Sequence, residues 1–215
     1  VTGVQTCALP IYVQGGKKLR LSRPQQLMAA EREIIEEAYA GDIIGVFDPG
    51  IFSIGDTLCA PGKKFRFDPI PTFAPEHFKR VRSLDTMKRK QFLKGMEQIA
   101  QEGAIQIFKT PYTGMEEVIV GVVGTLQFDV LEYRLKNEYN VELYMEGLPY
   151  EYLRWIETDD GEPVKEEDLI LGTDVKLVED YKGNQLLLFG SQWAIGWTEE
   201  RNKNLTFHEF GGTKF

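Results

Sequence analysis

The sequence has few cysteines and histidines and lacks any long apolar run. Its 215 residues include two cysteines, Cys7 and Cys59, with no CxxC spacing. This pattern argues against a disulfide framework and a zinc site, and it suits a reducing cytosol. No stretch of about 18 consecutive apolar residues occurs, so we expect no transmembrane helix. These absences predict a cytoplasmic protein that does not associate with membranes.

Motifs for catalysis and nucleotide binding are also missing. Neither of the glycine-rich patterns that cradle phosphates, GxxxxGK[ST] and GxGxxG, is present, and no GxSxG elbow occurs. The two histidines, His77 and His208, have no Cys, Asp or Glu at the spacing of a metal site. We therefore predict no catalytic, cofactor-binding or metal-binding residue in this chain.

The residues that are present describe a globular protein with an acidic balance. Apolar residues make up 42% and charged residues 27% of the chain, which is typical of globular domains. The length allows one large domain or two small ones. The net charge of −8 opposes non-specific binding to nucleic acid, but it leaves room for a local basic surface.

The first twelve residues, VTGVQTCALPIY, differ in character from the rest. They contain no Lys or Arg and no apolar core of the kind that a signal peptide has. They resemble the translated remnant of a sequencing adaptor. We interpret residues 1–12 as a non-native leader, and we expect that the natural protein begins further upstream and that this chain is a fragment.

Residues 13–68 have the pattern of an all-β domain. Ile43–Phe47 is predicted to be a short buried strand that ends at a DPG turn. The segment Ala29–Glu37 is ambiguous, because its helix propensity is high but its apolar face is thin. Strands bounded by Gly or Pro fit the C-terminal part of a β-barrel, and an incomplete barrel would leave open edges. This again indicates truncation at the front.

A proline-rich segment, FDPIPTFAP, follows this region. Pro69, Pro71 and Pro75 favour an extended path and mark a domain boundary, which we place near residues 67–71. The predicted domains are thus residues 13–68 and residues 69–215.

The second domain alternates strand and helix patterns in the order β-α-β-β-α-β. The predicted strands include Pro71–Arg82, Ala104–Phe108 and Val118–Val123. One helix carries the apolar stripe Phe92, Leu93, Met96, Ile99 and Ala100 and ends at Gly103, and a second carries Phe128, Leu131 and Leu135 and ends at Asn140. This order predicts an α+β fold, a split βαβ (ferredoxin-like) sandwich.

The pattern continues more weakly beyond the second helix. Tyr150–Ile156 is predicted to be an edge or return strand, and Val175–Val178 with Gln185–Phe189 a hairpin. The segment SQWAIGWTEERN indicates a short helix, and LTFHEF a closing strand.

The candidate functional surface is basic. Three groups contain most of the clustered Lys and Arg: Lys79, Arg80, Arg82, Lys88, Arg89 and Lys90; Lys17, Lys18, Arg20 and Arg23; and Lys63, Lys64 and Arg66. In an acidic chain such clusters indicate contact with a phosphate backbone. The alternative interpretation is a solvated strand end and helix start that only keep the domain soluble.

Two long segments carry a resemblance to a known family. The segments IPTFAPEHFKRVRSLDTMKRKQFLKGMEQIAQEGAIQIF and VGVVGTLQFDVLEYRLKNEYNVE resemble the C-terminal domain of the release factor 3 family. These are class II release factors of the translational GTPase family. SRPQQLMAAEREIIEEAYAGDIIGVFDPGIFSIGDTL is similar to the end of their β-barrel domain. The resemblance is close over residues 16–157 and looser beyond.

The resemblance implies a role in translation termination. Such factors are ribosome-dependent GTPases that promote dissociation and recycling of stop-codon-reading release factors. It implies ribosomal RNA, ribosomal proteins and class I release factors as partners and a monomeric state. GTP and Mg²⁺ would be bound by a domain that this chain lacks. The part of the factor that this chain represents would serve ribosome docking and conformational coupling. Its candidate contacts with the ribosome are Arg20, Arg23, Arg80, Arg82, Lys88, Arg89 and Lys90.

Other functions stay open on the sequence alone. The chain could be a stand-alone RNA- or protein-binding module, or part of a factor similar to elongation factor G. A small metabolic enzyme on a split βαβ fold would need a pocket with convergent polar groups, and the sequence indicates none.

We predict that this polypeptide neither binds nor hydrolyses GTP, because it contains no phosphate-binding loop. Titration of the chain with a fluorescent GTP analogue should show no saturable signal. Binding in the micromolar range would contradict the prediction.

Overall fold

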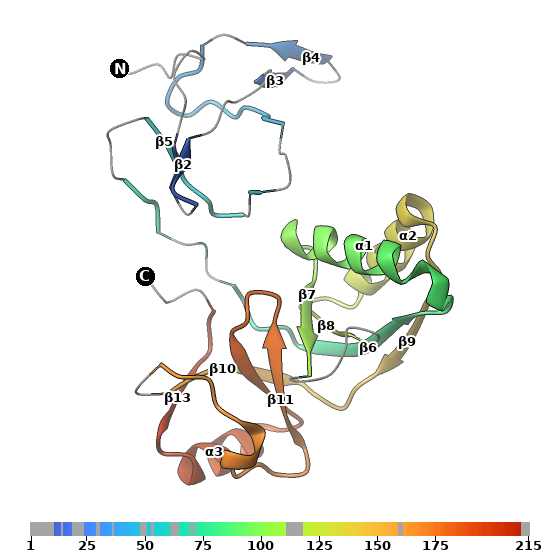
Figure 1. Ribbon diagram of the computed structural model, residues 1–215, viewed down its shortest axis with the longest axis vertical. Helices are drawn as coiled ribbons and strands as arrows, with labels where there is room; N and C mark the ends of the chain where they lie inside the picture. Colours follow the sequence, from blue (N-terminus) through green and yellow to red (C-terminus); the bar gives the residue numbers. More distant parts are fainter. Residues whose placement is uncertain are drawn as a thin grey trace. The chain divides into compact units, whose positions relative to one another are not determined.

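The computed structural model describes residues 11–13, 15–18, 24–28, 31–35, 37–47, 51–52, 54–60, 65–68, 70, 72–110, 118–158 and 161–211. The chain forms two compact units, Val1–Ile70 and Pro71–Phe215 (Figure 1). The division lies inside the proline-rich segment. Among the described residues, none of the helices has the length and apolar character needed to cross a membrane.

The first unit is built from short antiparallel strands. Strands β1 (Ile11–Tyr12), β2 (Lys17–Lys18) and β5 (Leu58–Cys59) form a sheet of order β2-β1-β5, and β3 (Gln25–Met28) pairs with β4 (Glu31–Ile34). Ile11 and Tyr12, which we assigned to the leader, thus take part in β1, while residues 1–10 lie outside the described residues.

One expectation for this unit needs correction, and one ambiguous segment is assigned. The predicted buried strand at residues 43–47 is wrong: Gly45 makes an isolated bridge with Gln25, and Ile43 and Phe47 are 86% and 71% exposed. All the buried hydrophobic residues among those described belong to the second unit, so this segment has no core to enter. Part of the ambiguous segment Ala29–Glu37 is the strand β4, because its thin apolar face could not anchor a helix.

The second unit begins with the predicted split βαβ arrangement. Its elements are β6 (His77–Ser83), α1 (Arg89–Gln101), β7 (Gln106–Lys109), β8 (Val118–Val122), α2 (Leu126–Tyr139) and β9 (Leu143–Gly147). The strands lie in the order β7-β8-β6-β9, and all neighbours are antiparallel. Both helices cover the same face of these strands (Figure 1). The α+β, ferredoxin-like prediction is confirmed.

Local sequence signals set the ends of these elements. The first strand begins at His77 rather than at Pro71, because prolines 71 and 75 cannot donate to a strand ladder. The Asp85 side chain accepts a hydrogen bond of 2.9 Å from the Met87 N–H and caps the 3-10 turn η1 (Thr86–Lys88), which leads into α1. Gly103 and Asn140 have φ of 74° and 55° and end the two helices, as predicted.

The core between helices and sheet follows the predicted stripes. On α1 the buried residues are Phe92, Gly95, Met96, Ile99 and Ala100, and on α2 they are Phe128, Leu131 and Leu135. They pack against sheet residues such as Val81, Ile107 and Val120. Fully burying side chains of this kind contributes roughly 1.5–3 kcal/mol each.

The sheet continues into a second half. Strand β11 (Val175–Asp180) joins β7, and β12 (Gln185–Phe189), β10 (Tyr152–Thr158) and β13 (Leu205–His208) follow, so the full order is β13-β10-β12-β11-β7-β8-β6-β9. The 3-10 turn η2 (Glu166–Asp168) and helix α3 (Gln192–Arg201) complete this half. The predicted hairpin, short helix and closing strand are confirmed, but β10 is an inner strand between β12 and β13, not an edge.

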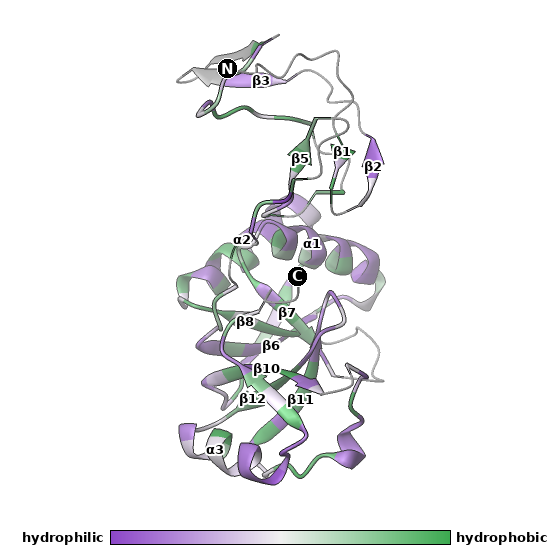
Figure 2. Ribbon diagram, turned by 90° about the vertical axis from the view of Figure 1, so that its left-hand side faces the viewer, coloured by the Kyte–Doolittle hydropathy of each residue, from purple (hydrophilic) through white to green (hydrophobic). Residues whose placement is uncertain are grey.

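The two halves bury apolar residues against each other. Phe78, Phe108 and Ile119, on the sheet face away from α1 and α2, cluster with Leu153, Trp155, Val178, Leu186 and Leu188 of the second half. A further cluster beneath α3 includes Ile156, Leu187 and Ile195. Figure 2 shows hydrophobic residues concentrated along these inner strands.

Two helical glycines allow a matched test of packing. Alanine at either site would favour the helix by about 1 kcal/mol. At Gly95 a Cβ atom would collide with the buried Leu135 side chain and lie 3.0 Å from the Tyr139 ring, whereas at Gly196 it would meet nothing within 4 Å. We expect Gly95→Ala to destabilise the second unit by about 1–2 kcal/mol, since overpacking costs roughly 1–3 kcal/mol.

The matched variant Gly196→Ala should leave the stability unchanged or raise it by up to about 1 kcal/mol. Urea unfolding followed by tryptophan fluorescence reports on this unit, because all three tryptophans lie in it. Equal effects of the two substitutions would show that Gly95 is not a packing position.

Candidate nucleic-acid interface

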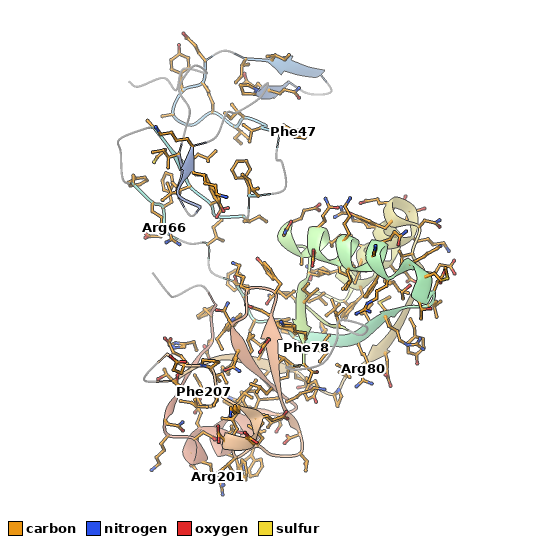
Figure 3. All side chains as sticks on the ribbon, viewed as in Figure 1. Phe47, Arg66, Phe78, Arg80, Arg201 and Phe207 are labelled. Atoms are coloured by element: carbon orange, nitrogen blue, oxygen red, sulfur yellow. The ribbon has the colours of Figure 1, made fainter. Side chains whose placement is uncertain are left out.

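Strand β6 distributes its basic residues over both faces of the sheet. Arg80 and Arg82 share a face with Phe78, away from α1 and α2, because side chains alternate along a strand. Lys79 lies on the helix side, where its Nζ is 4.4 Å from the centre of the Phe128 ring. Figure 3 shows Phe78 and Arg80 on the side of the sheet opposite the two helices.

Arg80 makes an ion pair across the sheet. It lies opposite Glu146 of β9, and its Nη1 is 3.3 Å from the Glu146 carboxylate. Their side chains are 41% and 50% exposed, so the pair contributes only about 0–1 kcal/mol to stability. The Glu146 carboxylate therefore holds the Arg80 guanidinium only weakly.

Arg82 stacks on an aromatic ring. Its partner in the β6–β9 register is Tyr144, and its guanidinium carbon is 4.6 Å from the centre of that ring. Tyr144 is 45% exposed. Tyr144 was not among the predicted contacts, although it stands between Leu143 and Met145 in the sequence, and strand alternation places it on the opposite face from these two apolar residues.

A tyrosine close to Arg80 stays neutral. Burial raises the pKa of the Tyr150 hydroxyl above its ordinary value of 10.0, and the positive charge of Arg80 only partly opposes this effect. Tyr150 also packs against the apolar cluster of Phe78 and Trp155. Tyr150 therefore borders Arg80 as a half-buried, neutral side chain, and the open face of β6 and β9 itself holds two arginines and an exposed aromatic ring.

The remaining residues of this basic group belong to the helical layer. Lys88 ends η1, and Arg89 and Lys90 open α1, where both are exposed. The Lys88 Nζ donates a hydrogen bond of 2.6 Å to the backbone carbonyl of Asn140, the residue that ends α2. The structure therefore separates this continuous sequence group into two surfaces, and it gives Lys88 a structural contact.

The first unit adds little to this picture. Arg20 and Arg23, predicted as contacts, lie outside the described residues, as do Lys63 and Lys64. Lys17 and Lys18 form the exposed strand β2, and Arg66 is also exposed (Figure 3).

The open face of β6 and β9 has the chemistry of a nucleic-acid contact. Arginines can bind phosphates in a bidentate manner, and an exposed aromatic ring beside a guanidinium can stack on a base. We name Arg80, Arg82 and Tyr144 the β6–β9 surface. In the described part of the chain, no three His, Cys, Asp or Glu side chains are grouped closely enough to hold a metal ion.

Comparison with known proteins covers both units. Residues 67–199 match the family described as "Class II release factor RF3, C-terminal domain", and residues 7–61 match "Elongation factor G domain 2". Similar proteins named peptide chain release factor 3 occur in Symbiobacterium thermophilum (50% identical over 91% of this chain), Gloeobacter violaceus (44% over 92%) and Listeria monocytogenes (44% over 88%). The chain covers 36%, 37% and 35% of these relatives, little more than a third of their length.

A β-rich unit of the elongation factor type, followed by a ferredoxin-like α+β unit, defines a translation-factor architecture. Within this class the match extends through the second unit at up to 50% identity. The chain belongs to the class II release factor 3 family.

Proposed function

We propose that this chain acts in translation termination, as the part of a release factor 3 protein that docks on the ribosome. The complete factor would promote dissociation and recycling of the release factors that read stop codons. Membership of the family, over both units, is the observation that supports this proposal. The partners would be ribosomal RNA, ribosomal proteins and class I release factors, with the chain monomeric in the cytoplasm.

The β6–β9 surface supports a docking role. Its two arginines lie on a rigid strand and stay accessible, and the stacked pair of Arg82 and Tyr144 holds one guanidinium in place. Arg89 and Lys90, at the start of α1, would form a second contact with phosphates. RNA affinity depends on such charge neutralisation and falls as salt increases.

The packing of the second unit supports a role in conformational coupling. Apolar clusters fill both faces of its sheet, and the strand pair β7–β11 joins the two halves. Because close-packed interiors resist deformation, such a unit moves as a body. A change in a nucleotide-binding domain of the complete factor would then shift the whole docking surface. GTP and Mg²⁺ chemistry belongs to that domain in this proposal.

The docking role predicts a specific salt dependence. Replacing both Arg80 and Arg82 by Gln should weaken binding of the chain to purified ribosomes. It should also lower the slope of log affinity against log salt by about one to two units, because each arginine that neutralises a phosphate accounts for about one unit. Affinity can be measured by sedimentation with ribosomes across a salt series.

The matched control replaces Lys165 and Lys203 by Gln. Both are exposed and lie in the second half of the unit, so the net charge changes equally without touching the β6–β9 surface. Circular dichroism should show both variants folded, because exposed ion pairs add little stability. If both variants lose the same ribosome affinity, the loss follows from the change in net charge alone. That result would contradict docking through Arg80 and Arg82.

The proposed function also predicts competition. In a purified termination reaction that contains an intact release factor 3, an excess of this chain should slow the turnover of class I release factors, because it occupies the docking site without supplying GTP chemistry. The Arg80→Gln/Arg82→Gln variant should inhibit less. Turnover that is unaffected by a chain that binds the ribosome would argue for a stand-alone binding module instead.

A further inference from the structure

Helix α2 has two apolar faces, and only one of them is buried. Phe128, Leu131 and Leu135 pack into the core. On the opposite side, Leu126, Val130 and Tyr133 are 74%, 49% and 68% exposed, at the i, i+4 and i+7 positions that align on one helix face. We name these three residues the α2 stripe.

Helix α1 provides an internal comparison. It lies in the same layer beside α2 and covers the same sheet (Figure 1). Its outward positions, opposite the buried residues Phe92, Met96 and Ile99, are polar or charged: Lys90, Lys94, Glu97, Gln98 and Gln101. Covering the core therefore does not require an apolar outer face, and the α2 stripe has another cause.

The charges beside the α2 stripe are predominantly negative. On one flank, Asp129 and Glu132 are exposed, and neither has an ion-pair partner among the described residues. On that flank Lys136 is 3.4 Å from the Glu142 carboxylate. Within the part of the chain that the structure describes, Asp129 and Glu132 thus have no ion-pair partner, and the nearby Lys136 pairs with Glu142 instead.

The other flank is also acidic. Arg134 lies between two carboxylates: its Nε donates to Glu138 Oε1 at 2.9 Å, and its guanidinium also pairs with Glu102. The hydrogen bond from Arg134 lowers the pKa of Glu138 below its ordinary value of 4.5, so this carboxylate is charged at neutral pH. One cation between two carboxylates leaves a net negative charge.

We propose that the outer face of α2 binds a basic, amphipathic segment of a protein partner. The α2 stripe would take apolar side chains of that segment, and Asp129 and Glu132 would pair with its Lys or Arg residues. Recognition of an amphipathic segment through residues one helical turn apart is a recurrent binding mode. Tyr133 supplies the kind of aromatic side chain that contributes most at protein interfaces.

The charge pattern distinguishes this face from an RNA contact. The β6–β9 surface presents arginines, whereas the α2 stripe is bordered by carboxylates that would repel phosphates. The unit therefore carries two surfaces of opposite character. The proposal for α2 stands independently of docking through Arg80 and Arg82.

The test uses the full chain labelled with ¹⁵N and three probes. The first is a synthetic peptide of about 16 residues, with leucines at i, i+4 and i+7 spacing and lysines elsewhere. The second carries glutamates in place of the lysines. The third is a single-stranded RNA of about 10 nucleotides. Only the basic peptide should shift the amide resonances of residues 123–137, in a saturable manner.

Two substitutions, each with a matched control, locate the binding. Leu126→Ser should weaken binding of the basic peptide about tenfold, whereas Leu84→Ser, at a leucine that is 56% exposed outside α2, should not. Asp129→Lys/Glu132→Lys should weaken it at least tenfold, and Glu199→Lys/Glu200→Lys on α3 should have a much smaller effect at the same net charge.

Several outcomes would overturn the proposal. They are shifts of the α2 amides by the RNA or by the acidic peptide, equal weakening in the two charge-reversal variants, and no response of α2 to the basic peptide at about 1 mM. Circular dichroism of each variant checks that the substituted residue, exposed in every case, left the fold intact.

Discussion

The structure of the second unit depends on burying the central strands of its sheet on both faces. All five residues of β8 are buried. One face packs beneath α1 and α2 through Val118, Val120 and Val122, and the other packs Ile119, with Phe78 and Phe108, against the second half of the unit. Antiparallel sheets often leave one face in water. Here the second half covers it, and the hydrophobic effect joins two small modules into one core.

The second half of the unit covers only part of the sheet, and this determines where the candidate functional surfaces lie. Toward β9 the sheet face away from the helices is no longer buried, and there Arg80, Arg82 and Tyr144 stay accessible. On the helix side, α2 fills the core with one face and presents Leu126 and Tyr133 with the other. The second unit thus presents a basic surface and, separately, an apolar surface bordered by carboxylates.

The sequence predicted the elements whose patterns are local and long. The helix stripes, the stops at Gly103 and Asn140 and the β-α-β-β-α-β order were all confirmed, because each follows from side-chain periodicity or from a single backbone conformation. The prediction of a buried strand at residues 43–47 was wrong because burial is not a local property. Its composition suits a strand, but burial requires a core around it, and a five-residue segment does not encode that core.

The residue pattern by itself determined the ferredoxin-like module and, through family resemblance, the family. Only the tertiary structure decided how the basic residues group: six Lys and Arg within twelve positions divide among the two faces of β6 and the start of α1, and Lys88 bonds to the Asn140 carbonyl 52 residues away. It also revealed Tyr144 beneath Arg82 and the inner position of β10. The physical reason is that strand pairing and cross-strand contacts join residues far apart in sequence, whereas periodicity reports only which face of its own element a residue occupies.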